Sequence, residues 1–285
     1  MATTAPAEAM AQNEKVLSDA LAAASLSDKD VETKPELEEG EIEEEEDDGN
    51  PKTVFDSAAR FNLKHPLYAK WTMYFDSLAS KATTKTEQTS IPNASAHGGW
   101  LDDIRRVMEF DSVEEFWGLY NNIVPPSQLP GKANYYLFKD GIIPAWEDAQ
   151  NKNGGKWAIQ VPRDKSKAQI DQMWLYTMLA AIGETFESGV DGSAPERSDL
   201  VTGVIMSCRP GFYRIALWTR DAPDVSLPET DELMKRILTI GRYFKVSVLG
   251  YAEDQKLMTG GFQTEILFES HKDSERKGNK NKLTI

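Results

Sequence analysis

The sequence predicts an α+β protein in which an antiparallel sheet is covered on one face by helices and preceded by an acidic, disordered tail. After residue 65, short runs of β-branched and aromatic residues alternate with turn signals, as in strands joined by hairpins. Three longer segments between them have helical periodicity. Residues 1–52 carry 16 acidic and 4 basic side chains, a net charge of −12 out of the −14 of the whole chain. We therefore divide the chain into a tail, 1–60, and a domain, 61–285.

The tail lacks the means to build a core. Residues 1–52 contain no aromatic residue, and the acidic run from Glu36 to Asp48 repels itself. The N-terminus has no signal-peptide pattern, and no stretch reaches the ~18 apolar residues of a membrane helix. Cys208 is the single cysteine, which excludes an internal disulfide and a thiolate-rich metal site. We expect a soluble protein of the cytoplasm, with the nucleus as a second compartment, and neither cofactor nor metal.

Strands are predicted wherever β-branched and aromatic residues run between turn signals. The six clear candidates are Leu67–Phe75, Asn134–Lys139, Lys156–Val161, Leu200–Cys208, Phe212–Thr219 and Val246–Tyr251. Two weaker candidates lie near Arg105–Phe110 and Thr264–Phe268.

The three predicted helices cover residues 110–120, 168–186 and 231–243. In the first, Ser112 and Glu115 have the spacing of a capping box. The second and third repeat apolar residues every three or four positions, as a helix packed on a sheet requires.

Period-two alternation assigns the polar residues of the strands to faces. Trp157 shares a face with apolar neighbours, and Lys156 points to the opposite, open face. Trp71, Trp157 and Trp174 are expected in the core. The Pro-Gly pair at 210–211 predicts a turn, so that Arg209 and Arg214 flank one hairpin. Guanidinium and ammonium groups on an open face suit phosphate oxygens.

Two tryptophans lie outside any core pattern. Trp146 is followed at once by Glu147, and Trp100 lies in a polar loop. Two indole rings can hold one flat ring between them, and a carboxylate accepts two hydrogen bonds from a guanine edge. Methylation at N7 makes guanine a cation, which adds roughly 0.5–2 kcal/mol per desolvated aromatic contact. These residues, with Lys156, Arg209 and Arg214, predict a receptor for an alkylated purine nucleotide.

Six segments in order along the chain closely resemble the eukaryotic translation initiation factor 4E family: HPLYAKW (65–71), FDSVEEFWGLY (110–120), YLFKDGIIPAWED (136–148), NGGKW (153–157), WLYTMLAAIGE (174–184) and IALWT (215–219). The resemblance implies a curved sheet of eight antiparallel strands with three helices on its convex face, and binding of the 7-methylguanosine 5′ cap of messenger RNA on the concave face. It implies that Trp100 and Trp146 sandwich the base, that Glu147 pairs with its edge and that Trp218 lies near the methyl group. Lys156, Arg209 and Arg214 would hold the triphosphate, although the family often has arginine at the position of Lys156.

The resemblance also implies a second site on the convex face. There the family docks the scaffold initiation factor 4G and inhibitory 4E-binding proteins through a Tyr-x-x-x-x-Leu-Φ helix. The matching residues are His65, Pro66, Val113, Trp117, Leu175 and Gly183. From the residues alone, Trp117 and Leu175 fit interhelical packing equally well.

The leading reading is a non-enzymatic adaptor that recruits capped messenger RNA to the translation machinery. One alternative is a cap-binding paralogue that represses translation. Another is a cap or nucleotide hydrolase that uses Glu147 and Asp148. The sequence disfavours the hydrolase, because its three histidines lack metal or triad spacing and residues 154–157 lack the P-loop spacing.

Overall fold

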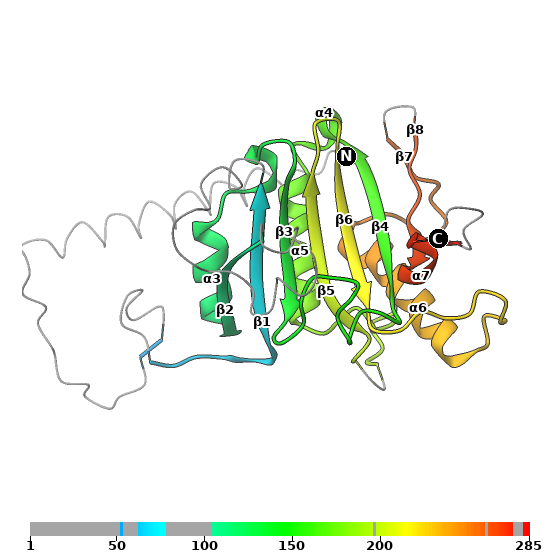
Figure 1. Cartoon of the computed structure of the whole chain (residues 1–285), viewed down its shortest axis with the longest axis horizontal. Helices are drawn as coiled ribbons and strands as arrows, with labels where there is room; N and C mark the ends of the chain where they lie inside the picture. The colour runs from blue at the N-terminus through cyan, green and yellow to red at the C-terminus, as the bar shows by residue number, and fades with distance from the viewer. Residues whose placement is uncertain (1–51, 54–61, 78–103, 196–197, 260–261, 276–281) are drawn as a thin grey trace, which may run out of the picture. The chain divides into compact units, whose positions relative to one another are not determined.

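The computed structural model describes residues 52–53, 62–77, 104–195, 198–259, 262–275 and 282–285. Within them, an antiparallel sheet of eight strands has the order β10-β9-β4-β6-β5-β3-β1-β2 (Figure 1). Its strands are β1 (Pro66–Ser77), β2 (Arg105–Ser112), β3 (Ala133–Lys139), β4 (Gly155–Pro162), β5 (Val201–Cys208), β6 (Phe212–Thr219), β9 (Leu267–Ser270) and β10 (Lys282–Thr284). A separate hairpin pairs β7 (Met258–Thr259) with β8 (Phe262–Gln263).

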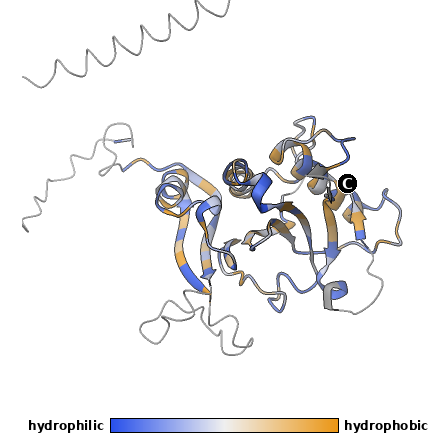
Figure 2. Cartoon of the chain, turned by 90° about the horizontal axis from the view of Figure 1, so that it is seen from above, coloured by the Kyte–Doolittle hydropathy of each residue, from blue (hydrophilic) through white to orange (hydrophobic). Residues whose placement is uncertain are grey.

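Three long helices lie on one side of the curved sheet, as Figure 2 shows. They are α3 (Val113–Asn122), α5 (Ile170–Ile182) and α6 (Glu232–Tyr243). Shorter helical pieces are η3 (Pro126–Gln128), α4 (Arg163–Ser166), η4 (Phe244–Val248) and α7 (His271–Glu275). None of the helices in the described part of the chain is long and apolar enough to cross a membrane. The fold class expected from the sequence is confirmed; the tail, including its acidic run, lies outside the described residues except for 52–53.

The main core lies between the sheet and these helices. Trp71, Trp157 and Trp174 are fully buried there, as their strand and helix positions predict. The indole Nε1 of Trp157 donates to the carbonyl oxygen of Ile237 in α6 at 3.0 Å, which joins the helix to β4 through a buried polar contact. Cys208 is buried at the end of β5, in agreement with the strand predicted at Leu200–Cys208.

Helix α3 begins where the capping pattern predicts. The Ser112 hydroxyl accepts a hydrogen bond from the Glu115 backbone N–H at 3.4 Å. The Glu115 carboxylate in turn accepts from the backbone N–H of Asp111 at 3.1 Å, one residue before the N-cap. Two backbone N–H groups at the β2–α3 junction are thereby satisfied.

The strand predicted at Val246–Tyr251 is wrong. Its first three residues belong to the π-helical turn η4, which continues α6 and in which Phe244, Lys245 and Val248 are buried, and residues 249–251 lie outside any strand. A short apolar run next to a helix fits either structure, and here burial against the core decides. The last strands were also misplaced or missed: β9 begins at Leu267 rather than Thr264, and β10 is a three-residue strand without a sequence signal.

The face of the sheet opposite the helices, called the open face below, carries a second apolar cluster. The loop between β3 and β4 covers part of it through Ile142 and Ala145. At its centre the Phe138 ring lies over Gly203, where a Cβ atom would approach the ring to 2.4 Å. Because Phe138 is fully buried, its ring has little room to move away.

We therefore expect Gly203→Ala to lower the free energy of unfolding by about 1–3 kcal/mol through overpacking. Gly118 is the matched control, because it lies inside α3 with nothing within 4 Å of an added Cβ. Gly118→Ala should raise the free energy of unfolding by up to about 1 kcal/mol. Urea denaturation measures both changes, and equal effects of the two substitutions would contradict this account of Gly203.

Candidate functional site

The register of the sheet groups the residues of the open face into rows. Phe138, Gly203, Trp218 and Lys156 are successive cross-strand partners on β3, β5, β6 and β4. The Phe138 ring and the Trp218 indole meet in a T-shaped arrangement, with centroids 5.6 Å apart and ring planes at 81°. A glycine between two aromatic residues thus lets their rings meet and fixes the position of the Trp218 indole.

Trp146 and Glu147 are presented by a loop that buried polar groups hold in place. The amide of Asn151, which is fully buried, donates to the carbonyl oxygens of Ile143 at 2.9 Å and Ala145 at 3.0 Å. The Asp148 carboxylate accepts from the backbone N–H of Ile143 at 3.0 Å and from that of Gln150 at 2.7 Å. The Trp146 side chain is 41% exposed, and Glu147 is also exposed.

The side chains of this loop therefore have different roles. Asp148 and Asn151 hold the backbone, and Ile142 and Ala145 attach it to the open face. The Trp146 indole and the Glu147 carboxylate remain exposed. Trp146 and Glu147 were predicted from the sequence, whereas Asn151 was not. The sequence pattern that could have identified Asn151 is a polar residue that closely follows a turn.

The three predicted cations all lie on or beside the open face. Lys156 lies on β4, Arg214 on β6, and Arg209 directly after β5. An Arg209 guanidinium nitrogen donates to the Asn134 side-chain oxygen at 3.0 Å and to the Cys208 carbonyl oxygen at 2.9 Å. Burial, and secondarily the nearby charge of Arg209, lower the pKa of Arg214. Two guanidinium groups that repel each other in a partly buried position can be stabilised by an anion placed between them.

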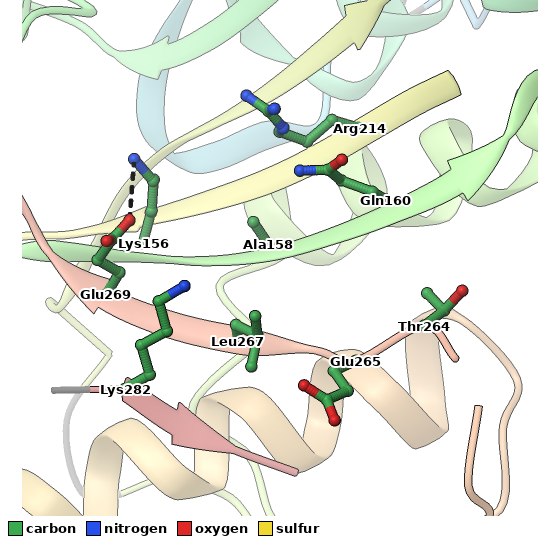
Figure 3. A pocket seen from close by; sticks show the side chains of 9 residues that line it. All are labelled: Lys156, Ala158, Gln160, Arg214, Thr264, Glu265, Leu267, Glu269 and Lys282. Carbon is green, nitrogen blue, oxygen red and sulfur yellow. Dashed lines mark ion pairs between the residues drawn. The ribbon is translucent and has the colours of Figure 1, made fainter. Parts of the chain in front are cut away.

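A cavity of about 390 Å³ lies beside two of these cations, over β4, β6 and β9 (Figure 3). Lys156 and Arg214 line it, together with Gln160, the cross-strand partner of Arg214. With its amide oxygen turned toward the guanidinium, Gln160 accepts from the Nε of Arg214 at 3.3 Å and from a terminal nitrogen at 3.1 Å. The hydrogen bond orients the guanidinium, and sequence reasoning did not identify Gln160 as part of the site.

Trp218 also packs against a histidine from the end of the chain. The His271 ring lies 4.3 Å from the Trp218 ring, centroid to centroid, and His271 is 3% exposed. Burial, and secondarily the charge of Lys156, lower the pKa of His271 to about 4 against the opposing effect of Glu269. The imidazole is therefore neutral at pH 7 and acts as a flat packing partner for the indole. The sequence gives no sign of this contact, because His271 and Trp218 are far apart along the chain.

Trp100 lies outside the described residues, so its place beside Trp146 stays a prediction. The other base-site residues, Trp146, Glu147 and Trp218, and the three cations are described, and all are associated with the open face. The assignment of each to base or phosphate likewise stays a prediction.

The residues predicted for partner binding lie at the start of β1, on α3 and on α5. Val113 and Trp117 are each 37% exposed and lie four residues apart on α3, so their side chains are neighbours on the surface of that helix. His65 lies at the α3 N-terminus, where its backbone N–H donates to Glu114 at 2.9 Å and its ring Nδ1 lies 2.6 Å from the same carboxylate. These contacts with His65 lower the pKa of Glu114 to about 2. Leu175 is half-buried on α5, and Gly183 and Pro66 are exposed.

Comparisons with known proteins agree on one family. A family model described as "Eukaryotic initiation factor 4E" matches residues 66–285. The chain is 38% identical to eukaryotic translation initiation factor 4E of Candida albicans over 202 residues, 70% of this chain and 86% of that protein. It is 38% identical to factor 4E-1 of Schizosaccharomyces pombe over 206 residues, 72% of this chain and 84% of that protein.

Two solved structures are similar in fold. One is Ascaris suum eIF4E-3 in complex with the m2,2,7G cap, with a TM-score of 0.57 and 27% identity, over 78% of this chain and 99% of that one. The other is C. elegans eIF4E-3 in complex with the 4E-binding protein Mextli, with a TM-score of 0.55 and 29% identity, over 77% of this chain and 100% of that one.

The depressed pKa of His271 predicts a pH dependence of stability. Between pH 6.5, the ordinary pKa of histidine, and about 4, the unfolded chain binds a proton that the folded chain does not. The stabilisation is therefore complete above pH 6.5 and is lost as the pH falls, by about 2 kcal/mol at pH 5. Urea denaturation at pH 7.5 and pH 5 should show a wild-type loss that His271→Asn lacks. An identical pH dependence in both proteins would contradict this.

Proposed function

This chain belongs to the eukaryotic initiation factor 4E family, and we propose that it binds the 7-methylguanosine 5′ cap of messenger RNA on its open face during translation initiation. The observation that carries the proposal is the exposure of Trp146 and Glu147 on a loop attached to the same face that bears Lys156 and Arg214. A flat cationic base needs the indole and the carboxylate of the loop, and the negatively charged phosphates attached to it need the cations. The similar Ascaris structure is a complex with a cap.

In this proposal the base stacks on the Trp146 indole, with the Trp100 indole on its other face. The N7-methylated ring is positive, so each electron-rich indole attracts it more strongly than neutral guanine. The exposed Glu147 carboxylate accepts from the N1–H and the amino group of the base edge. Trp218, held between Phe138 and His271, offers an apolar surface to the methyl group.

The phosphates lie across the cations of the open face. Arg209 and Arg214 repel each other in the free protein, and a bound phosphate oxygen between them removes that cost. Gln160 and Asn134 orient the two guanidinium groups, so little side-chain entropy is lost when the ligand binds. Lys156 adds a point charge at the other end of the cavity.

The convex-side residues suit a second partner, an amphipathic Tyr-x-x-x-x-Leu-Φ helix. Val113 and Trp117 provide the exposed apolar anchors that a helix-in-groove contact needs. The similar C. elegans structure is a complex with a 4E-binding protein. On this basis the chain connects capped messenger RNA to the scaffold factor 4G in the cytoplasm, with a nuclear pool as a second location, and is open to control by 4E-binding proteins.

The alternatives differ in what the same residues must do. A hydrolase would need Asp148 as an acid, base or metal ligand, but both of its carboxylate oxygens accept backbone N–H groups of its own loop. A repressor paralogue would bind the cap without the scaffold factor, and capture of factor 4G by the full chain separates it from the leading proposal.

Trp146→Ala should weaken binding of 7-methyl-GTP by about 5- to 150-fold, because stacking of one base is worth roughly 1–3 kcal/mol. Titration monitored by tryptophan fluorescence measures the affinity, with unmethylated GTP as the comparison ligand. Trp117→Ala is the matched control, since it removes an equally large, similarly exposed indole from a helix on the other side of the sheet. Wild-type protein that failed to prefer 7-methyl-GTP over GTP would contradict the proposal.

Trp117→Ala should in turn weaken binding of a Tyr-x-x-x-x-Leu-Φ peptide by about 30-fold or more, as loss of an aromatic anchor does at an interface. Leu227→Ala, which shortens an exposed apolar side chain before α6, should leave peptide binding unchanged. Fluorescence anisotropy of a labelled peptide gives both values. If Trp117→Ala instead lowered the melting temperature and impaired both ligands, Trp117 would be a packing residue.

A further inference from the structure

Three charged residues form a row across the edge of the open face where the cavity lies. Glu269 on β9 is the direct cross-strand partner of Lys156 on β4 and of Lys282 on β10. Direct partners in an antiparallel sheet project from the same face with their Cβ atoms about 4.5–5.5 Å apart. All three side chains line the cavity that also contains Arg214, as Figure 3 shows.

The carboxylate in this row is poorly exposed. The Glu269 side chain is 15% exposed and that of Lys156 is 29% exposed, with Lys156 Nζ 3.9 Å from Glu269 Oε2. Charges this close to the protein interior are screened less by water and salt than charges on the outer surface. The negative charge of Glu269 thus lies inside a cavity whose other charged walls are Lys156, Arg214 and Lys282, together with the more exposed carboxylate of Glu265.

We propose that Glu269 is a specificity-determining residue that competes with the ligand's phosphates for Lys156. In the free protein its carboxylate offsets the Lys156 ammonium. When a phosphate approaches Lys156, the Glu269 carboxylate repels it. Each added phosphate therefore raises the affinity less than it would if Glu269 carried no charge. Lys282, on the opposite side of Glu269, limits this repulsion.

This inference rests on the proposed function and states how Glu269 changes the affinity for the phosphates. Glu269 lowers the affinity for the phosphate chain and leaves stacking of the base on Trp146 unchanged. It therefore reduces the ratio of the affinity for 7-methyl-GTP to the affinity for 7-methylguanosine, which has no phosphate.

Glu269→Gln keeps the shape of the side chain and removes its charge. In the full-length protein it should raise that affinity ratio by about 3- to 30-fold, the range expected for one partly screened charge a few ångströms from a phosphate. Affinity for 7-methylguanosine should stay unchanged. The gain should shrink as salt is raised from 0.05 to ~0.5 M, because screening weakens the repulsion that was removed.

Two further variants separate charge from packing. Glu269→Asp keeps the negative charge and should keep the wild-type ratio within about twofold. Glu229→Gln removes an equal charge from a side chain that is 78% exposed near α6 and does not line the cavity, and it should leave the ratio unchanged.

The inference is overturned if Glu269→Gln leaves the ratio unchanged or lowers it, if Glu269→Asp raises it as much, or if Glu229→Gln has the same effect. In these cases the wild-type preference for 7-methyl-GTP over GTP would still stand, so the proposed function would survive. Wild-type protein that bound neither methylated ligand would overturn both.

Discussion

The contact of Phe138 with Trp218 above Gly203 is the constraint on which the open face depends. Sheet register makes these residues successive partners, and the missing Cβ of Gly203 gives the phenyl ring its space. The same row of cross-strand partners continues to Lys156 and Glu269. One register therefore aligns the aromatic residues of the open face with the charged residues at its edge. His271 closes the other side of the Trp218 indole without bringing a charge at neutral pH, because burial keeps it unprotonated.

The cations on the open face contrast with the net negative charge of the whole chain. The protein has a net charge of −14, yet Lys156, Arg209 and Arg214 gather along one part of the open face. The two arginines are positioned by side-chain amides and backbone carbonyls, which orient a guanidinium without neutralising it. Lys156 is the exception, since Glu269 lies beside it. The face therefore combines two cations oriented by neutral groups with one cation that is partly offset by a carboxylate.

Most of the fold could be predicted because apolar residues recur every two positions in the strands and every three or four positions in the helices. Trp157 and Lys156 were assigned to opposite faces correctly from alternation alone. The strand at Val246–Tyr251 was wrong because a short apolar run carries no period that separates strand from helix, and burial against the core decided it. Of the candidate site, the side chains with distinctive chemistry were found. Gly203, Asn151, Gln160 and His271 were missed, because their roles come from cross-strand partners and loop contacts far apart in the sequence.

The central claim is that one methylated nucleotide binds across the open face and leaves the helical side of the sheet untouched. Indole ¹H–¹⁵N spectra of the tryptophan-labelled protein test it most directly, because each tryptophan gives its own signal and substitution assigns it. On addition of 7-methyl-GTP, the Trp146 and Trp218 signals should shift, and those of Trp117 on α3 and Trp174 on α5 should stay in place. Shifts at Trp117 or Trp174 with Trp146 and Trp218 unmoved would contradict the account.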